Sequence, residues 1–286
     1  MKIRLFYLWC LLSVFALILS VGYVIGFIFY RGVPALSLSL FFGDTPVTDA
    51  VFGLSPVWGG IWPACVGSVS VVSGALGLAL LPGIATGIWL ATSQDSRFRR
   101  WLTLGVDILA GLPSVLMGLF GFTLLLFLRG TLLPAANASL LLSALCLAML
   151  ILPYLAAATR TALLALPQQL TVTALSLGMT PWQTLRRVLL PQAARGIAGG
   201  ILLATGRAAE DTAVIMLTGA VASAGLPAGL FERYEALPFT IFYYSAQYQS
   251  ENELQMAFGA ALTLLCITAT LFALVERSRF IRGDQA

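Results

Sequence analysis

Histidine is absent from the 286-residue chain, and Lys2 is its one lysine. A P-loop needs a lysine after its glycines, and a Ser-His-Asp triad needs a histidine. The chain is therefore not expected to hydrolyse a nucleotide by the P-loop route or to catalyse acyl transfer with such a triad.

Cysteine is rare. Cys10, Cys65, Cys146 and Cys266 are far apart, and no two have the CxxC spacing of metal and redox sites. Most of them lie inside apolar runs, where a small hydrophobic side chain is the expected role. The sequence predicts neither a metal site nor a disulfide, and nothing in it calls for a cofactor.

Charged residues are scarce too, at 10% of the chain against 59% hydrophobic residues. A soluble domain of this length needs more charge to cover its surface. Together with a mean hydropathy of +0.93, this composition places the chain among integral membrane proteins. The lipid bilayer is the expected partner of most of its surface.

Six segments are apolar over the roughly 20 residues that a helix needs to cross the hydrocarbon core. The first is too long for the apolar region of a signal peptide, so we expect it to be retained. Pro113 falls inside the third. The predicted fold is an all-α integral membrane protein with six transmembrane helices, at about residues 6–30, 64–91, 102–128, 139–158, 196–222 and 256–275.

Basic residues gather on one side of these spans. That side carries Lys2, Arg4, Arg97, Arg99, Arg100, Arg160, Arg186, Arg187, Arg195, Arg277, Arg279 and Arg282, whereas the opposite loops hold Arg31, Arg129 and Arg233. The positive-inside rule then puts both termini in the cytoplasm. Topology explains the net charge of +4, so no nucleic-acid partner is implied.

Two long outer segments, 31–63 and 223–255, are rich in glycine, proline and aromatic residues. They either form a docking surface for an extracytoplasmic partner or pack as caps at headgroup depth. We divide the chain into residues 1–63, a helix with an outer loop, and residues 64–286, a five-helix core. No soluble domain is present, so any energy source or ligand-binding module must be another chain.

The stretch ATGRAAEDTAV, residues 204–214, places Arg207, Glu210 and Asp211 near the middle of the fifth predicted span and on one helical face. Each charge at that depth costs roughly 2.5–3.5 kcal/mol, so the three must pair, meet water or titrate. In one explanation Arg207 pairs with one carboxylate, and the other is protonated or bonded to Asp107 or Ser114. In the other, the face lines a translocation path between two subunits, where Arg207 binds an oxyanion.

Residues 173–197 read TALSLGMTPWQTLRRVLLPQAARGI. Thr180 and Pro181 predict a helix start, and Pro191 is expected to end that helix about three turns later. One face of the helix holds Trp182, Leu185, Val188 and Leu189, and another holds Gln183, Arg186 and Arg187. Such a short amphipathic helix either lies on lipid headgroups or contacts a partner.

This segment resembles the cytoplasmic loop of bacterial ABC importer permeases, which reads Glu-Ala-Ala, then Gly, then a hydrophobic residue with Leu-Pro. Here Val172 stands in place of the usual Glu. In that family the loop forms a coupling helix that sits in a cleft of the ATPase subunit. The resemblance implies a coupling loop at about residues 159–195, with Ala174, Gly178, Thr180, Pro181, Trp182, Leu185, Arg186, Leu190 and Pro191 as its coupling residues.

Three more stretches are similar to phosphate-type permeases: ILAGLPSVLMGLFG (108–121) to their third-span signature, GRAAEDTA (206–213) to their fifth-span signature, and LPFTIFYYSAQ (237–247) to the outer loop before the last span of PstA members. By this resemblance the chain is identified as a PstA-like permease with type I ABC importer architecture, in the bacterial inner membrane. Glu210 stands where the family has Gly, and Asp211 where it has Glu.

The resemblance implies a non-catalytic subunit of an ATP-driven importer that moves phosphate, or a related oxyanion, by alternating access. The implied partners are two ATPase subunits, a second permease of PstC type and an extracytoplasmic substrate-binding protein. The implied pathway residues are Arg207, Glu210, Asp211 and Ser114. In that setting a carboxylate can accept the O–H of monohydrogen phosphate, which sulfate at neutral pH lacks.

Three other functions compete with this one: a secondary transporter, a membrane scaffold and an intramembrane hydrolase. A secondary transporter predicts an internal repeat, and none is evident between residues 1–140 and 141–286. A membrane scaffold without ATPase coupling remains open because of Val172. An intramembrane hydrolase using Glu210, Asp211 or Asp107 needs a second catalytic group across a water-filled cleft, and no such motif is found.

Overall fold

The computed structural model describes residues 2–93 and 95–281, which are helical apart from connections and one isolated bridge between Ala220 and Tyr234. Within these residues, six helices are long and apolar enough to cross a membrane. The predicted all-α fold with six spans is therefore confirmed.

The long helices are α1 (Lys2–Gly32), α4 (Trp62–Thr92), α5 (Arg97–Gly111), α6 (Ser114–Thr131), α7 (Leu140–Leu164), α10 (Leu190–Glu210) and α13 (Glu251–Ile281). The short elements are η1 (Val33–Ala35), α2 (Leu38–Phe42), α3 (Val47–Phe52), α8 (Gln168–Ser176), α9 (Pro181–Thr184), a π-helical turn η2 (Leu185–Leu189), α11 (Thr212–Thr218) and α12 (Leu237–Gln247).

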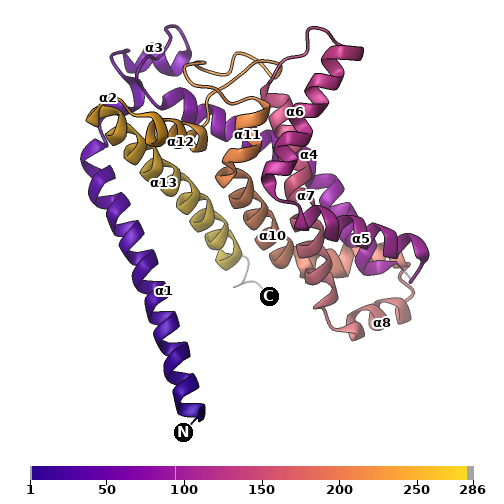
Figure 1. The fold of residues 1–286 in the computed structure, drawn as a ribbon. Helices are drawn as coiled ribbons and strands as arrows, with labels where there is room; N and C mark the ends of the chain where they lie inside the picture. Colours follow the sequence, from indigo (N-terminus) through magenta and orange to yellow (C-terminus); the bar gives the residue numbers. More distant parts are fainter. Residues whose placement is uncertain (1, 94, 282–286) are drawn as a thin grey trace.

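The start of α1, the end of α13 and the α8 segment lie on one side of the spans, at the bottom of Figure 1. We call this the arginine-rich side, because it carries most of the chain's arginines. On the opposite side, at the top of Figure 1, α2, α3 and α12 form what we call the helical cap.

Helix α7 is the centre of the bundle and packs between α4 and α10. Glycines make the approach close: a Cβ added at Gly83 would lie 2.7 Å from Leu155, and one at Gly87 would lie 2.5 Å from Thr159. Gly200 faces Ala158 even more tightly. Helices in lipid associate through such packing, because lipid tails are as apolar as the side chains.

The third predicted span is wrong as one continuous helix. The chain leaves helical geometry at Leu112 and Pro113, whose ψ angles are 129° and 137°, and this separates α5 from α6. Proline disfavours a helical conformation in the residue before it. Of the two pieces, only α6 qualifies as a span. Helix α5 packs on α4 and α7 through Val106.

The fifth predicted span, residues 196–222, also needs correction at both ends. Pro191 does not end the coupling helix, because the backbone continues through η2 into α10. In η2 the Leu190 N–H donates to the oxygen of Leu185, one residue further back than in an α-helix. This wider turn accommodates a proline that has no N–H and whose ring collides with the preceding turn. The other end of α10 is at Glu210, where Asp211 interrupts the helix.

Side-chain hydrogen bonds fix the start of α12 to α4 and stabilise the loop between α11 and α12. Ser68 Oγ, on α4, accepts a hydrogen bond of 2.7 Å from the Leu237 N–H at the start of α12. The carboxylate of Glu235 accepts one of 2.8 Å from the Gly225 N–H. Burial raises the pKa of Glu235 above its ordinary value, and hydrogen bonds from Gly225 and Ala224 act in the opposite direction.

Replacing Gly200 with valine tests the α7–α10 contact. We expect Gly200→Val to destabilise the protein by about 1–3 kcal/mol, because the added methyl groups collide with Ala158. Thermal unfolding in detergent measures the effect. Gly22→Val is the matched control, since a Cβ at Gly22 meets nothing within 4 Å. Equal melting temperatures of the two variants would contradict close packing at Gly200.

Candidate functional site

Asp211 is the residue at which the fifth span breaks. Its backbone has φ −79° and ψ 109°, and its Oδ1 accepts a hydrogen bond of 2.9 Å from the Val214 N–H, so it caps the start of α11. Its Oδ2 lies 3.2 Å from Nη2 of Arg207. The Asp211 side chain is 1% exposed and that of Arg207 is 32% exposed. The buried Asp211 carboxylate thus accepts a hydrogen bond from the start of α11 and balances the charge of Arg207.

Glu210 is placed differently, although it is the adjacent residue. Its side chain is exposed, and in the described residues it takes part in neither of the two salt bridges and in no side-chain hydrogen bond. Leu203, Arg207 and Glu210 share one face of α10 at positions i, i+4 and i+7. Leu203 is exposed as well. This face, which we call the open face of α10, is left uncovered by the other residues that the structure describes.

The open face lies at the middle of the bundle. Gly200 is beside Ala158 of α7, and the Thr218 hydroxyl donates to Ser143 Oγ on the same helix. Residues 207–211 fall between these two contacts, level with the middle of α7 (Leu140–Leu164). An ionised side chain at that depth does not face lipid without a large cost.

Ser114 is at the same level. Helices α6 and α11 run side by side, with Gly118 against Ala213 and Val214 and Gly121 against Thr218. Ser114 lies one turn before Gly118 and is the first residue of α6. The break between α5 and α6 and the break between α10 and α11 therefore lie at one depth. Irregular backbone at membrane depth is tolerated where it is covered by protein or lines a water-filled cavity.

The structure thus brings Arg207, Asp211, Glu210 and Ser114 to one level but gives them different surroundings. Asp107 is exposed on α5, which packs beside Ala156, nearer the arginine-rich side. The break at Asp211 and the position of Leu203 on the open face were not predicted from the sequence. The spacing of Leu203, Arg207 and Glu210 in the sequence could have predicted that Leu203 lies on this face.

The start of the proposed coupling helix is as predicted. Thr180 Oγ1 accepts from the Gln183 N–H at 3.3 Å, and Gln183 Oε1 accepts from the Thr180 N–H at 2.9 Å. These reciprocal bonds form a capping box, and Pro181 is the first helical residue. The two arginines Arg186 and Arg187 are exposed.

The segment before it ends in a turn that requires glycine. Gly178 has φ +83°, in the left-handed region. The Met179 N–H donates to Ala174 at 3.2 Å and the Gly178 N–H donates to Leu175 at 3.0 Å, which closes the C-terminus of α8 as a Schellman motif. Ala174 is buried, whereas Val172 is exposed. An apolar side chain therefore stands on the surface at the position where the resemblance to the permease loop predicts Glu.

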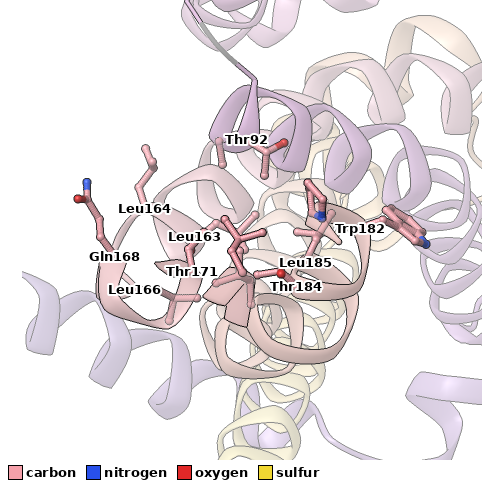
Figure 2. A pocket seen from close by; sticks show the side chains of 13 residues that line it. Thr92, Leu163, Leu164, Leu166, Gln168, Thr171, Trp182, Thr184 and Leu185 are labelled. Carbon is pink, nitrogen blue, oxygen red and sulfur yellow. The ribbon is translucent and has the colours of Figure 1, made fainter. Parts of the chain in front are cut away.

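A cavity of about 580 Å³ lies between this loop and the ends of α4 and α7 (Figure 2). Its walls are mostly apolar, and threonine and glutamine contribute polar side chains to them. The lining includes Thr92, Leu163, Leu164, Leu166, Gln168, Thr171, Trp182, Thr184 and Leu185. Leu185 and Leu163 are buried in one cluster with Ala193, while Leu190 is half-buried and packs against it. Trp182 is 65% exposed, so it does not join that cluster.

Membrane helices that are interrupted at one depth around charged side chains are typical of transporters, and fold and site together define that class here. Residues 83–279 match the family described as binding-protein-dependent transport system inner membrane component. The chain belongs to this family. It is thus a multi-pass, non-catalytic membrane component of an ABC transport system.

Several relatives are similar over most of their length. The phosphate transport system permease protein PstA of Haemophilus influenzae is 30% identical over 85% of this chain and 82% of its own length. PstA of Xylella fastidiosa is 32% identical over 85% of this chain and 81% of its own. The phosphate transport system permease protein PstC 1 of Mycobacterium bovis is 30% identical over 70% of this chain and 65% of its own.

Solved structures show the same fold at low sequence identity. A chain of the MetNI methionine ABC transporter, in an inward-facing conformation, has a TM-score of 0.58 at 19% identity and covers 77% of this chain and 96% of its own. A chain of an amino acid ABC transporter has a TM-score of 0.55 at 16% identity, covering 74% and 89%. These likenesses support the type I importer permease architecture.

Two substitutions of Asp211 distinguish its hydrogen bond to the start of α11 from its ion pair with Arg207. Asparagine is a good N-cap, so Asp211→Asn keeps the bond to Val214 and loses the ion pair with Arg207. Asp211→Ala loses both. We expect the alanine variant to be about 1 kcal/mol less stable than the asparagine variant. Unfolding midpoints in detergent measure this difference, and equal midpoints would contradict a stabilising cap on α11.

Proposed function

We propose that this chain is a permease subunit of an ATP-driven importer that carries inorganic phosphate, or a closely related oxyanion, across the bacterial cytoplasmic membrane by alternating access. The observation that carries this proposal is the open face of α10. There the partly exposed Arg207 and the exposed Glu210 lie level with the middle of α7. Such a face needs a second protein chain, water or a polar substrate beside it.

Arg207 is the residue proposed to contact the anion. A guanidinium offers a planar set of N–H donors that matches an oxyanion. Within residues 2–93 and 95–281, Arg207 has one ion pair, with Asp211, which leaves most of those donors available. Ser114, at the same level, adds a hydroxyl and the positive end of α6. The names of the PstA and PstC relatives support phosphate as the cargo.

The proposed partners contact the two opposite sides of the membrane spans. The coupling loop, residues 159–195, is proposed to dock one ATPase subunit. A second ATPase subunit is proposed to dock on a second permease of PstC type. The helical cap on the opposite side is proposed to receive an extracytoplasmic substrate-binding protein. Both termini then lie in the cytoplasm, in agreement with the arginines of the arginine-rich side.

Residues 1–63 are proposed as an N-terminal unit, a transmembrane helix with an outer loop, that packs beside the five-helix core of residues 64–286. The ring centroids of Phe27, on α1, and Phe258, on α13, are 5.6 Å apart. The apolar stretch of α1 that precedes Phe27 is exposed. That exposure supports lipid or the second permease as the neighbour of α1.

Substitution of Arg207 tests the pathway. In proteoliposomes that contain the assembled complex and enclosed ATP, we expect Arg207→Gln to lower the initial rate of phosphate uptake by about tenfold or more, because a charged hydrogen-bond donor is lost. Arg233→Gln, at an exposed arginine outside the spans, is the control. Unchanged uptake by an assembled Arg207→Gln complex refutes the pathway role. Uptake without ATP, driven by a proton gradient, would indicate a secondary transporter.

A further inference from the structure

The two neighbouring carboxylates of the fifth span differ in how much of their hydrogen-bonding capacity is used. Asp211 is buried, caps α11 with one oxygen and faces Arg207 with the other. Glu210 is exposed, and within the described residues its carboxylate forms neither an ion pair nor a side-chain hydrogen bond. Asp211 therefore serves the fold, and Glu210 is available to a ligand.

Glu210 is available at a specific place. It shares the open face of α10 with Arg207, one turn away, and lies level with Ser114 at the start of α6. A ligand held by the Arg207 guanidinium is then within one helical turn of the Glu210 carboxylate. The same face offers donors and one acceptor to whatever occupies it.

A carboxylate beside an anion-binding arginine selects among anions by their protons. A fully ionised oxyanion presents only acceptors, so it is repelled by Glu210 and forms no bond with it. A tetrahedral oxyanion that keeps an O–H can donate that proton to the carboxylate, and O–H···O⁻ bonds are short and strong. Phosphate and arsenate keep such a proton at neutral pH, whereas sulfate does not.

We propose that Glu210 is a specificity-determining residue that makes this pathway accept protonated tetrahedral oxyanions and exclude fully ionised ones. The inference rests on the proposed function, namely that the open face lines the substrate path. It concerns the substrate class of the same site, and it assigns the selection to Glu210 rather than to Asp211.

Protection of an introduced cysteine tests the selection directly. The exposed residue Leu203, on the same face, is replaced by cysteine in a chain whose exposed Cys10 and Cys266 are changed to serine. The complex with the second permease is placed in nanodiscs without a binding protein. The rate of modification of the introduced thiol by a small water-soluble methanethiosulfonate reagent is then measured in rising concentrations of phosphate, arsenate or sulfate.

With Glu210 present, we expect phosphate and arsenate to protect the introduced thiol at concentrations about tenfold or more below that of sulfate, which is the size of one charge-assisted hydrogen bond. In Glu210→Gln that preference is expected to fall to within about twofold, because the charge that repels sulfate is gone. Glu210→Asp keeps a carboxylate and is expected to keep the preference. A tenfold preference that survives in Glu210→Gln overturns the inference.

The remaining outcomes separate this inference from the proposed function. If phosphate protects, and protection is lost in Arg207→Gln but the preference is the same in all Glu210 variants, the pathway is right and the role of Glu210 is wrong. If Glu210→Gln no longer co-purifies with the second permease while Glu210→Asp does, Glu210 forms an ion pair between subunits, and the inference is again wrong. If no anion protects any variant, the proposed pathway fails and the inference fails with it.

Discussion

At the level of the middle of α7, the carboxylate of Asp211 meets two demands that a membrane protein cannot leave unmet. Its Oδ1 satisfies a backbone N–H at the start of α11, and its Oδ2 faces the Arg207 guanidinium at 3.2 Å. Without water, an unsatisfied backbone group or an unbalanced charge at this depth is costly. Interrupting the span is tolerable because one side chain corrects both consequences. The rest of the candidate site depends on these two contacts of Asp211, with the Val214 N–H and with Arg207.

The surrounding bundle keeps that site in place. Glycines of α4 and α10 allow both helices to approach α7 closely, and Gly118 and Gly121 bring α6 against α11. On the far side of the break, Thr218 donates to Ser143, so α11 is tied to α7 by a side-chain bond as well as by packing. The open face of α10 is therefore presented by a rigid framework, which suits a site that must orient a small anion.

Much of the fold could be predicted from composition and hydrophobic length, because a span is a matter of apolar residues and their number. The capping box at Thr180 was also predictable, since it depends on residues three positions apart. The breaks at Pro113 and Asp211 were missed, because an apolar run does not reveal where its helix is interrupted. Pro191 was misjudged for a different reason. Whether a proline ends a helix depends on whether the turn before it can widen, as η2 does here.

Because Pro191 does not end the helix, the capping box at Thr180 and the open face of α10 belong to the same helical segment. From Pro181 to Glu210 the chain is helical over 30 residues, through α9, η2 and α10, with no loop between the capping box and the open face. At about 1.5 Å per residue this helical path is roughly 45 Å long. The capping box and the Glu210 carboxylate are therefore linked by unbroken helical backbone, and the π-helical turn η2 with Pro191 is where that backbone can bend.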